Sequence, residues 1–203
     1  MTLITRREVL RATALAAIVT PGLSVAGVPD LITVRARAGA TTGVLTFRGK
    51  VFACAVGRAG VVVDKREGDR GTPSGRFPLR ELRYRPDRMT APATRLPRFA
   101  ARANDGWCDD PADPAYNRLV AMPHQTDAKT MWREDGLYDL VTVIGYNDDP
   151  VRPGAGSAIF MHVAENIAGG LGPTSGCVSL RAADLLAVLA ACGPATEIDI
   201  RAV

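Results

Sequence analysis

Residues 157–180 read SAIFMHVAENIAGGLGPTSGCVSL, and this stretch indicates how the second half of the chain folds. Residues 157–163 form a short apolar run of the kind found in buried strands. Residues 166–172 contain three glycines, which predict a tightly turning loop. Cys177 follows this loop, and a helical pattern begins at residue 181. We therefore expect a strand that carries His162, a glycine-rich loop, and a cysteine just ahead of a helix.

The predicted helix covers residues 181–192. Leu185, Leu189 and Cys192 fall on one helical face, and Leu186 is expected to widen it. The Gly-Pro pair that follows is a typical helix stop. Residues 197–201 then alternate isoleucine with polar residues, which predicts a closing strand.

The rest of the chain predicts mostly strands. Two-residue alternation and short apolar runs between glycines indicate strands over residues 31–37, 44–47, 51–56, 60–64 and 140–145. The expected fold is therefore mainly β, with one main helix near the C-terminus.

Two segments are expected to be irregular. Residues 83–107 are rich in proline and arginine and show no period, which predicts a long loop packed over the sheet. Residues 72–75 read Thr-Pro-Ser-Gly, which suits a type I turn with proline second and glycine fourth.

Length and composition indicate an ordinary globular protein. The chain has 203 residues, of which 47% are hydrophobic and 23% charged, so one domain with a substantial core is expected. The net charge is +4, and residues 1–26 contribute three arginines and one glutamate, or +2. The remaining +2 comes from 22 basic and 20 acidic residues, which is too small a surplus to indicate nucleic-acid binding.

Residues 1–26 predict an export signal. Arg6 and Arg7 precede an apolar stretch over residues 12–23, and Ser24-Val25-Ala26 supplies small residues at the cleavage position. The arginine pair is typical of a twin-arginine signal. The apolar stretch is shorter than the roughly 20 residues a transmembrane helix needs, so no stable membrane insertion is expected after signal removal. We expect a mature domain over residues 27–203, located in the periplasm.

The chain has four cysteines, at positions 54, 108, 177 and 192. An even number in an oxidising compartment admits disulfides. Cys177 is expected to be free, whereas the sequence leaves open whether the other three form disulfides.

Cys177 and His162 are the candidate catalytic pair. A nearby histidine and a helix N-terminus would both favour the thiolate, which is the nucleophilic form of cysteine. Gly176 lets a substrate carbonyl approach the backbone closely, so the N–H groups of Gly176 and Cys177 are the predicted oxyanion hole. The chain lacks a phosphate-binding Gly-Lys-Ser/Thr motif and the usual metal-binding spacings, so neither a cofactor nor a metal is expected.

Two motifs resemble the L,D-transpeptidase catalytic domain of the YkuD type. One is His162 followed fifteen residues later by Cys177 in Thr-Ser-Gly-Cys, and the other is Thr-Pro-Ser-Gly-Arg-Phe over residues 72–77. The resemblance covers roughly residues 31–203 and implies a sandwich-like mixed β-sheet. Ser175 stands where the family usually has histidine, and Ser179 where it often has asparagine or arginine. These differences suggest a divergent proteobacterial branch.

The resemblance implies a peptidoglycan cross-linking reaction. Cys177 would form a thioester with the third residue of a tetrapeptide donor stem and release D-Ala, and an amine of an acceptor stem would then resolve it. His162 would act as base and later as acid, oriented by the backbone carbonyl of Val163. The implied partners are peptidoglycan stem peptides, and the sequence leaves open which cross-link is made.

Carboxylates on such a substrate favour arginines near the cleft. The candidate substrate-binding residues are Ser175, Arg118, Arg76, Trp107, Tyr146 and Asn147. Two alternatives to transpeptidation stay open. With water as the acceptor the protein would be an L,D-carboxypeptidase or amidase, and without a reactive thiol it would be a non-catalytic peptidoglycan-binding module. Papain-like peptidases place the cysteine before the histidine, which is the opposite order.

Overall fold

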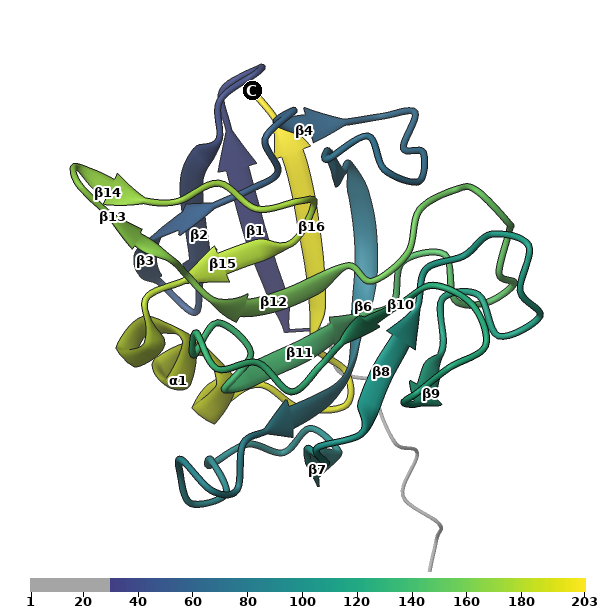
Figure 1. Ribbon diagram of the computed structural model, residues 1–203. Helices are drawn as coiled ribbons and strands as arrows, with labels where there is room; N and C mark the ends of the chain where they lie inside the picture. The colour runs from purple at the N-terminus through teal and green to yellow at the C-terminus, as the bar shows by residue number, and fades with distance from the viewer. Residues whose placement is uncertain (1–29) are drawn as a thin grey trace, which may run out of the picture.

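A computed structural model describes residues 30–203, and one mixed β-sheet dominates it (Figure 1). The predicted mainly β fold with a single main helix is confirmed for this part of the chain. The predicted export signal over residues 1–26 lies outside the described residues. Within residues 30–203, no helix is both long enough and apolar enough to cross a membrane.

The two ends of the described chain meet in the centre of the sheet. Strands β1 (Leu31–Ala36), β2 (Thr42–Phe47) and β3 (Lys50–Ala55) form an antiparallel meander. Strand β16 (Glu197–Ala202) pairs with β1 in parallel. Alternate β1 residues are buried, as the two-residue period predicts.

The sheet closes on itself through β11 (Leu140–Ile144). This strand pairs with β6 (Gly75–Tyr84) on one side and with β12 (Phe160–Val163) on the other. From β12 the sheet continues through β15 (Val178–Leu180) to β3, and β6 pairs with β16. Because no edge is left between β6 and β11, the inward-facing side chains of all eight strands enclose one core.

The helix α1 (Ala182–Ala191) packs against β12 and β15 at one side of the sheet (Figure 1). Leu185, Leu189 and Cys192 are fully buried, which confirms the predicted face. Leu186 is 39% exposed, so its predicted place on that face is wrong. Val188 is buried in its place.

Short strands occupy several segments that the sequence left irregular. β7 (Arg98–Ala100) runs beside β6, and a small separate sheet has the order β10 (Ala128–Thr130), β8 (Asp105–Cys108), β9 (Leu119–Ala121). The prediction of a plain loop over residues 83–107 is therefore wrong where β7 and β8 form. Both strands depend on pairing with distant segments, which local periodicity does not report.

Two further short pairings surround the later motifs. β4 (Val61–Val62) pairs in parallel with β5 (Thr72–Pro73), and β13 (Asn166–Ile167) with β14 (Gly170–Leu171) forms a hairpin inside the glycine-rich loop. The predicted type I turn over residues 72–75 is wrong, because the chain there passes extended from β5 into β6.

Candidate active site

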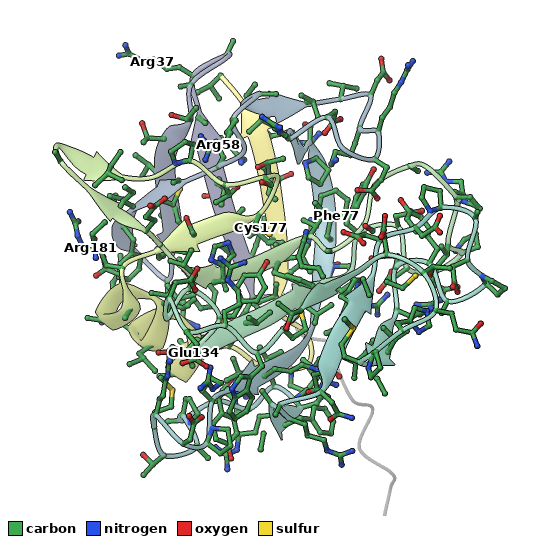
Figure 2. All side chains as sticks on the ribbon, viewed as in Figure 1. Arg37, Arg58, Phe77, Glu134, Cys177 and Arg181 are labelled. Atoms are coloured by element: carbon green, nitrogen blue, oxygen red, sulfur yellow. The ribbon has the colours of Figure 1, made fainter. Side chains whose placement is uncertain are left out.

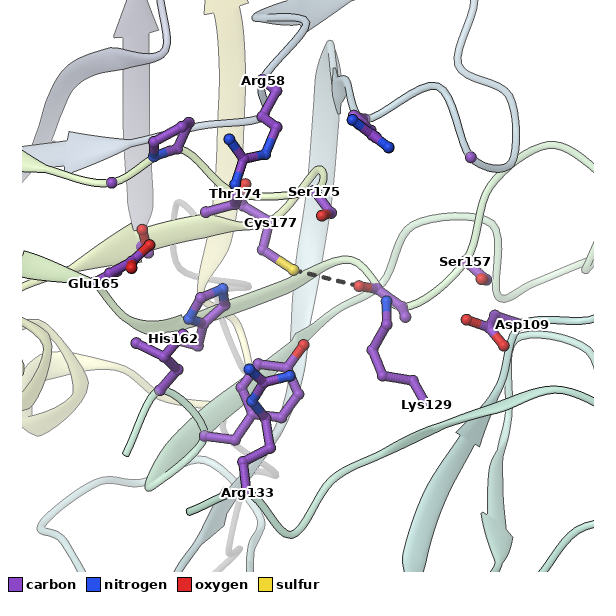
Figure 3. Close-up of a pocket in the computed structure, with 18 of the residues that line it drawn as sticks. Arg58, Asp109, Lys129, Arg133, Ser157, His162, Glu165, Thr174, Ser175 and Cys177 are labelled. Atoms are coloured by element: carbon purple, nitrogen blue, oxygen red, sulfur yellow. Dashed lines mark hydrogen bonds between the residues drawn. The ribbon is translucent and has the colours of Figure 1, made fainter. Parts of the chain in front are cut away.

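Cys177 and His162 line one cavity of about 580 Å³ on the face of the sheet formed by β12 and β15. Figure 2 places Cys177 near the middle of the molecule, with Arg58 beside it, and Figure 3 shows the imidazole and the sulfur facing each other. Both residues are largely buried. The fold thus brings the two predicted catalytic side chains into a single pocket.

The backbone before Cys177 takes a conformation that favours glycine. Gly176 has φ of +133°, and a Cβ there would lie 2.9 Å from the carbonyl oxygen of Gly71. The glycine therefore allows the loop before Cys177 to pass directly over the segment that leads into β5. This contact places the two sequence motifs that carried the family resemblance against each other.

Two threonines hold the carbonyl group of Cys177. Thr174 donates its hydroxyl to the Cys177 carbonyl oxygen at 2.6 Å, and Thr72 donates to the same oxygen at 3.3 Å. The Thr72 hydroxyl also accepts a hydrogen bond from the N–H of Gly57 at 2.8 Å. Neither threonine was predicted to be a positioning residue, although each lies within one of the two motifs.

His162 is oriented by its neighbour in β12. Its Nδ1 lies 2.8 Å from the carbonyl oxygen of Val163. A carbonyl oxygen can only accept, so Nδ1 carries the proton and Nε2 is left to receive one from the thiol. Tyr138 packs edge-on against the imidazole, with ring centroids 5.2 Å apart, and limits its rotation.

The surroundings of the sulfur favour its ionised form. Burial raises the pKa of the Cys177 thiol, but a hydrogen bond from His162 and the charges of His162 and Lys129 lower it, so the pKa lies below its ordinary value. The N–H of Phe160 also donates to Sγ at 3.4 Å. In the thiol form, Sγ–H donates to the carbonyl of Ala158 at 3.4 Å, which is the contact dashed in Figure 3.

The helix does not contribute to this ionisation as the sequence suggested. Strand β15 follows Cys177 directly, and α1 begins only at Ala182. Helix-terminal charge falls off within the first turn, so the predicted helix-dipole contribution to the Cys177 thiolate is wrong. The imidazole, the Lys129 ammonium and a strand N–H take its place.

One of the two predicted oxyanion donors is already engaged. The N–H of Gly176 donates to the Thr174 hydroxyl at 3.1 Å. The N–H of Cys177 is therefore the remaining candidate from the predicted pair. The Gly176 N–H would contribute to an oxyanion hole only if its hydrogen bond to the Thr174 hydroxyl broke.

The cavity is lined by charges of both signs. Lys129 in β10 and Arg58 extend into it, and Arg133 lies near His162 (Figure 3). Asp109 and Glu165 provide opposite charge at the same surface. Of the six predicted substrate-binding residues, Ser175 alone lines this cavity, and it is exposed there.

Three other predicted substrate-binding residues surround a separate cavity of about 260 Å³. Trp107 packs edge-to-face on Phe160 and donates its ring N–H to Asn117 at 3.0 Å. Tyr146 donates its hydroxyl to the carbonyl of Ala155, and Arg118 donates to the carbonyl of Asp148. Trp107 shares a buried hydrophobic cluster with Phe160 and Cys177, but none of the three predicted residues lines the cavity of Cys177.

The last two predicted residues make structural contacts. The Asn147 amide donates to the carbonyls of Arg152 and Gly156 and so closes a loop. Arg76 lies on β6, where it is exposed and pairs with Glu197. Neither residue lines the cavity of Cys177.

All four cysteines are free. Burial raises the pKa of Cys54 and of Cys192 to about 12, so these two thiols stay protonated at neutral pH. The pKa of Cys177 is instead lowered, which distinguishes this thiol from those of Cys54 and Cys192.

Fold and cavity together define a mainly β protein with a buried cysteine–histidine pair suited to acyl chemistry. A family model for the L,D-transpeptidase catalytic domain, YkuD, matches residues 33–200. The chain therefore belongs to the L,D-transpeptidase catalytic domain family, which implies peptidoglycan as the substrate class. A search of curated proteins found no match to the chain.

Proposed function

We propose that this protein is a peptidoglycan L,D-transpeptidase in which Cys177 is the nucleophile and His162 the general base and acid. The observation that carries this proposal is the shared cavity, in which the imidazole faces a thiol whose pKa is lowered despite burial. Burial without such a partner raises the pKa of a thiol and leaves it unreactive, as for Cys54.

In the first half-reaction, the Cys177 thiolate attacks the carbonyl carbon of the third residue of a donor tetrapeptide stem. The new C–S bond forms as the C–N bond to D-Ala breaks, and the His162 imidazolium gives its proton to the departing amine. Val163 keeps the proton on Nδ1 throughout, so Nε2 performs both transfers.

In the second half-reaction, the amine of an acceptor stem attacks the thioester. His162 takes a proton from that amine, a new amide forms and the thiolate leaves. The mixed charges of the cavity support a substrate with both carboxylate and amine groups, such as the diaminopimelate of a stem peptide.

The test is product analysis with purified mature protein and tetrapeptide-containing muropeptides. We expect release of D-Ala together with cross-linked dimers, and loss of both in Cys177→Ala and His162→Gln. Cys54→Ala, which changes a thiol outside the cavity, is the control. Tripeptides without dimers would identify a hydrolase instead, and unchanged activity of Cys177→Ala would refute the enzymatic proposal.

We further propose that residues 1–26 direct export to the periplasm by the twin-arginine route. The proposal rests on the arginine pair and the short apolar stretch. N-terminal sequencing of the exported protein should find cleavage after Ala26 or within a few residues of it. The double variant Arg6→Lys, Arg7→Lys should retain the precursor in the cytoplasm, and normal export of that variant would contradict this route.

A further inference from the structure

A second cluster of reactive side chains lies outside the catalytic cavity. Cys108 ends β8, Asp113 lies in the turn that follows, and His124 lies between β9 and β10. Their ligand atoms all fall within 4.8 Å of one another, which makes them the one such group of His, Cys and acidic side chains among residues 30–203. The chain has two histidines, His162 and His124, and the proposed reaction uses only His162.

We propose that Cys108, Asp113 and His124 bind a divalent transition-metal ion, for which Zn²⁺ is the best fit. A thiolate, an imidazole and a carboxylate are the ligand types that Zn²⁺ prefers, whereas Mg²⁺ and Ca²⁺ prefer oxygen ligands alone. The combination of sulfur, nitrogen and oxygen therefore selects the class of ion.

The distances suit a small tetrahedral ion. Zinc–ligand bonds of roughly 2.0–2.3 Å place tetrahedral ligand atoms about 3.3–3.8 Å apart. His124 Nε2 lies 3.2 Å from Asp113 Oδ2. The Cys108 sulfur lies within 4.8 Å of one ligand atom of each of the other two residues, so a small inward movement would complete three corners of a tetrahedron.

Backbone hydrogen bonds hold two of the three ligands, Asp113 and Cys108, in place. One Asp113 carboxylate oxygen, Oδ1, accepts the N–H of Ala115 at 2.6 Å, which leaves Oδ2 facing His124. Cys108 is locked in the small sheet, where its N–H donates to the Arg118 carbonyl and its own carbonyl accepts the N–H of Asn117. These hydrogen bonds reduce the ordering that metal binding would require.

Thr126 supports the same cluster. Its hydroxyl donates to Asp113 Oδ2 at 2.7 Å and lies 3.8 Å from the Cys108 sulfur. Groups that hold metal ligands in place commonly contribute about 10–100-fold to metal affinity. Three side-chain ligands leave the fourth position for water or for Thr126.

The cluster is connected to the catalytic cavity through the small sheet. Cys108 pairs with Ala128, and the residues that follow these two in the chain, Asp109 and Lys129, line the cavity of Cys177. A metal ion at the cluster would tie the end of β8 to the segment that leads from His124 into β10, and so help to fix the Lys129 ammonium near the sulfur.

The test is titration of the chelator-treated mature protein with Zn²⁺ by calorimetry, together with the thiolate-to-metal absorption band of bound Co²⁺. We expect one equivalent of tightly bound ion. Cys108→Ser and His124→Ala should each weaken binding by at least about 100-fold, and Thr126→Val by about 10–100-fold. Cys108→Ser should also remove the Co²⁺ absorption band.

The catalytic pair also offers a thiolate and an imidazole, so Cys177→Ala is the essential control and should leave binding and the absorption band intact. Loss of binding in Cys177→Ala, or wild-type binding in both Cys108→Ser and His124→Ala, would overturn the proposal. If Cys108→Ser does not fold, His124→Ala decides, because the His124 side chain is partly exposed and its removal leaves the small sheet paired.

Discussion

The Thr174 hydroxyl donates a hydrogen bond of 2.6 Å to the carbonyl oxygen of Cys177, three residues further along the chain. The same hydroxyl oxygen accepts the N–H of Gly176 at 3.1 Å. One buried side chain thus holds the Ser175–Gly176 peptide group before the nucleophile and the Cys177–Val178 peptide group after it. The position of the sulfur in the cavity depends on this short arrangement.

Thr174→Val should therefore impair both stability and activity. Removing the hydroxyl leaves a buried N–H with no acceptor and weakens the hold on the Cys177 carbonyl, which we expect to cost about 1–3 kcal/mol of unfolding free energy. Urea denaturation and kcat/KM measure the two effects. Thr174→Ser keeps the hydroxyl and should restore most of both; equal losses in the two variants would contradict this role.

Gly176→Ala should destabilise the protein more than an alanine at another left-handed glycine. The new Cβ would meet the Gly71 carbonyl at 2.9 Å, in addition to the strain of a positive φ, which is about 1–3 kcal/mol. Gly169→Ala is the matched control, because Gly169 also has a positive φ but no atom within 4 Å of the position that a Cβ would take. Thermal unfolding of both variants makes the comparison.

Cys177 should react with thiol reagents before Cys54 and Cys192. The pKa of Cys177 is lowered, whereas burial raises the pKa values of Cys54 and Cys192 to about 12. At pH 7, therefore, only roughly one in 10⁵ of the Cys54 and Cys192 thiols is ionised. We expect iodoacetamide or a carbapenem to modify Cys177 selectively, as read by peptide mass spectrometry. Equal labelling of Cys54 or Cys108 would count against the assignment.

Lys129→Met should shift the reactivity of Cys177 to higher pH. Burial raises the pKa of this thiol, and His162 and then Lys129 lower it, so loss of the ammonium raises the pKa. Alkylation requires the thiolate, and its rate at a fixed pH below the midpoint should fall severalfold. The pH profile of the alkylation rate tests this. Lys50→Met, at an exposed position of β3, should leave the profile unchanged.

Adjacent leucines of α1 should differ sharply in their effect on stability. Leu185 is fully buried and Leu186 is 39% exposed. Leu185→Ala should cost about 2–5 kcal/mol of unfolding free energy, because it leaves a cavity in the core. Leu186→Ala should change it by less than about 0.5 kcal/mol. Denaturant unfolding of the two variants compares them, and similar losses would contradict the observed helical face.

Local patterns in the sequence predicted much of the fold. Alternation over residues 31–37 identified β1, and the spacing of Leu185, Leu189 and Cys192 identified the buried face of α1. These patterns are readable because side-chain direction repeats every two residues in a strand and every 3.6 in a helix. The helical spacing did not predict that Leu186 is exposed, because the width of a buried face depends on what packs against it.

The sequence alone determined the mainly β class, the single helix and the choice of Cys177 and His162 as the pair to test. Only the tertiary structure decided what surrounds that pair. The Thr72 hydroxyl reaches the Cys177 carbonyl across 105 residues of sequence, and Lys129 and the Cys108, Asp113 and His124 cluster depend on a small sheet that no local period reports. Closure of the sheet and pairing between distant strands bring these groups together, and such contacts leave no regular spacing along the chain.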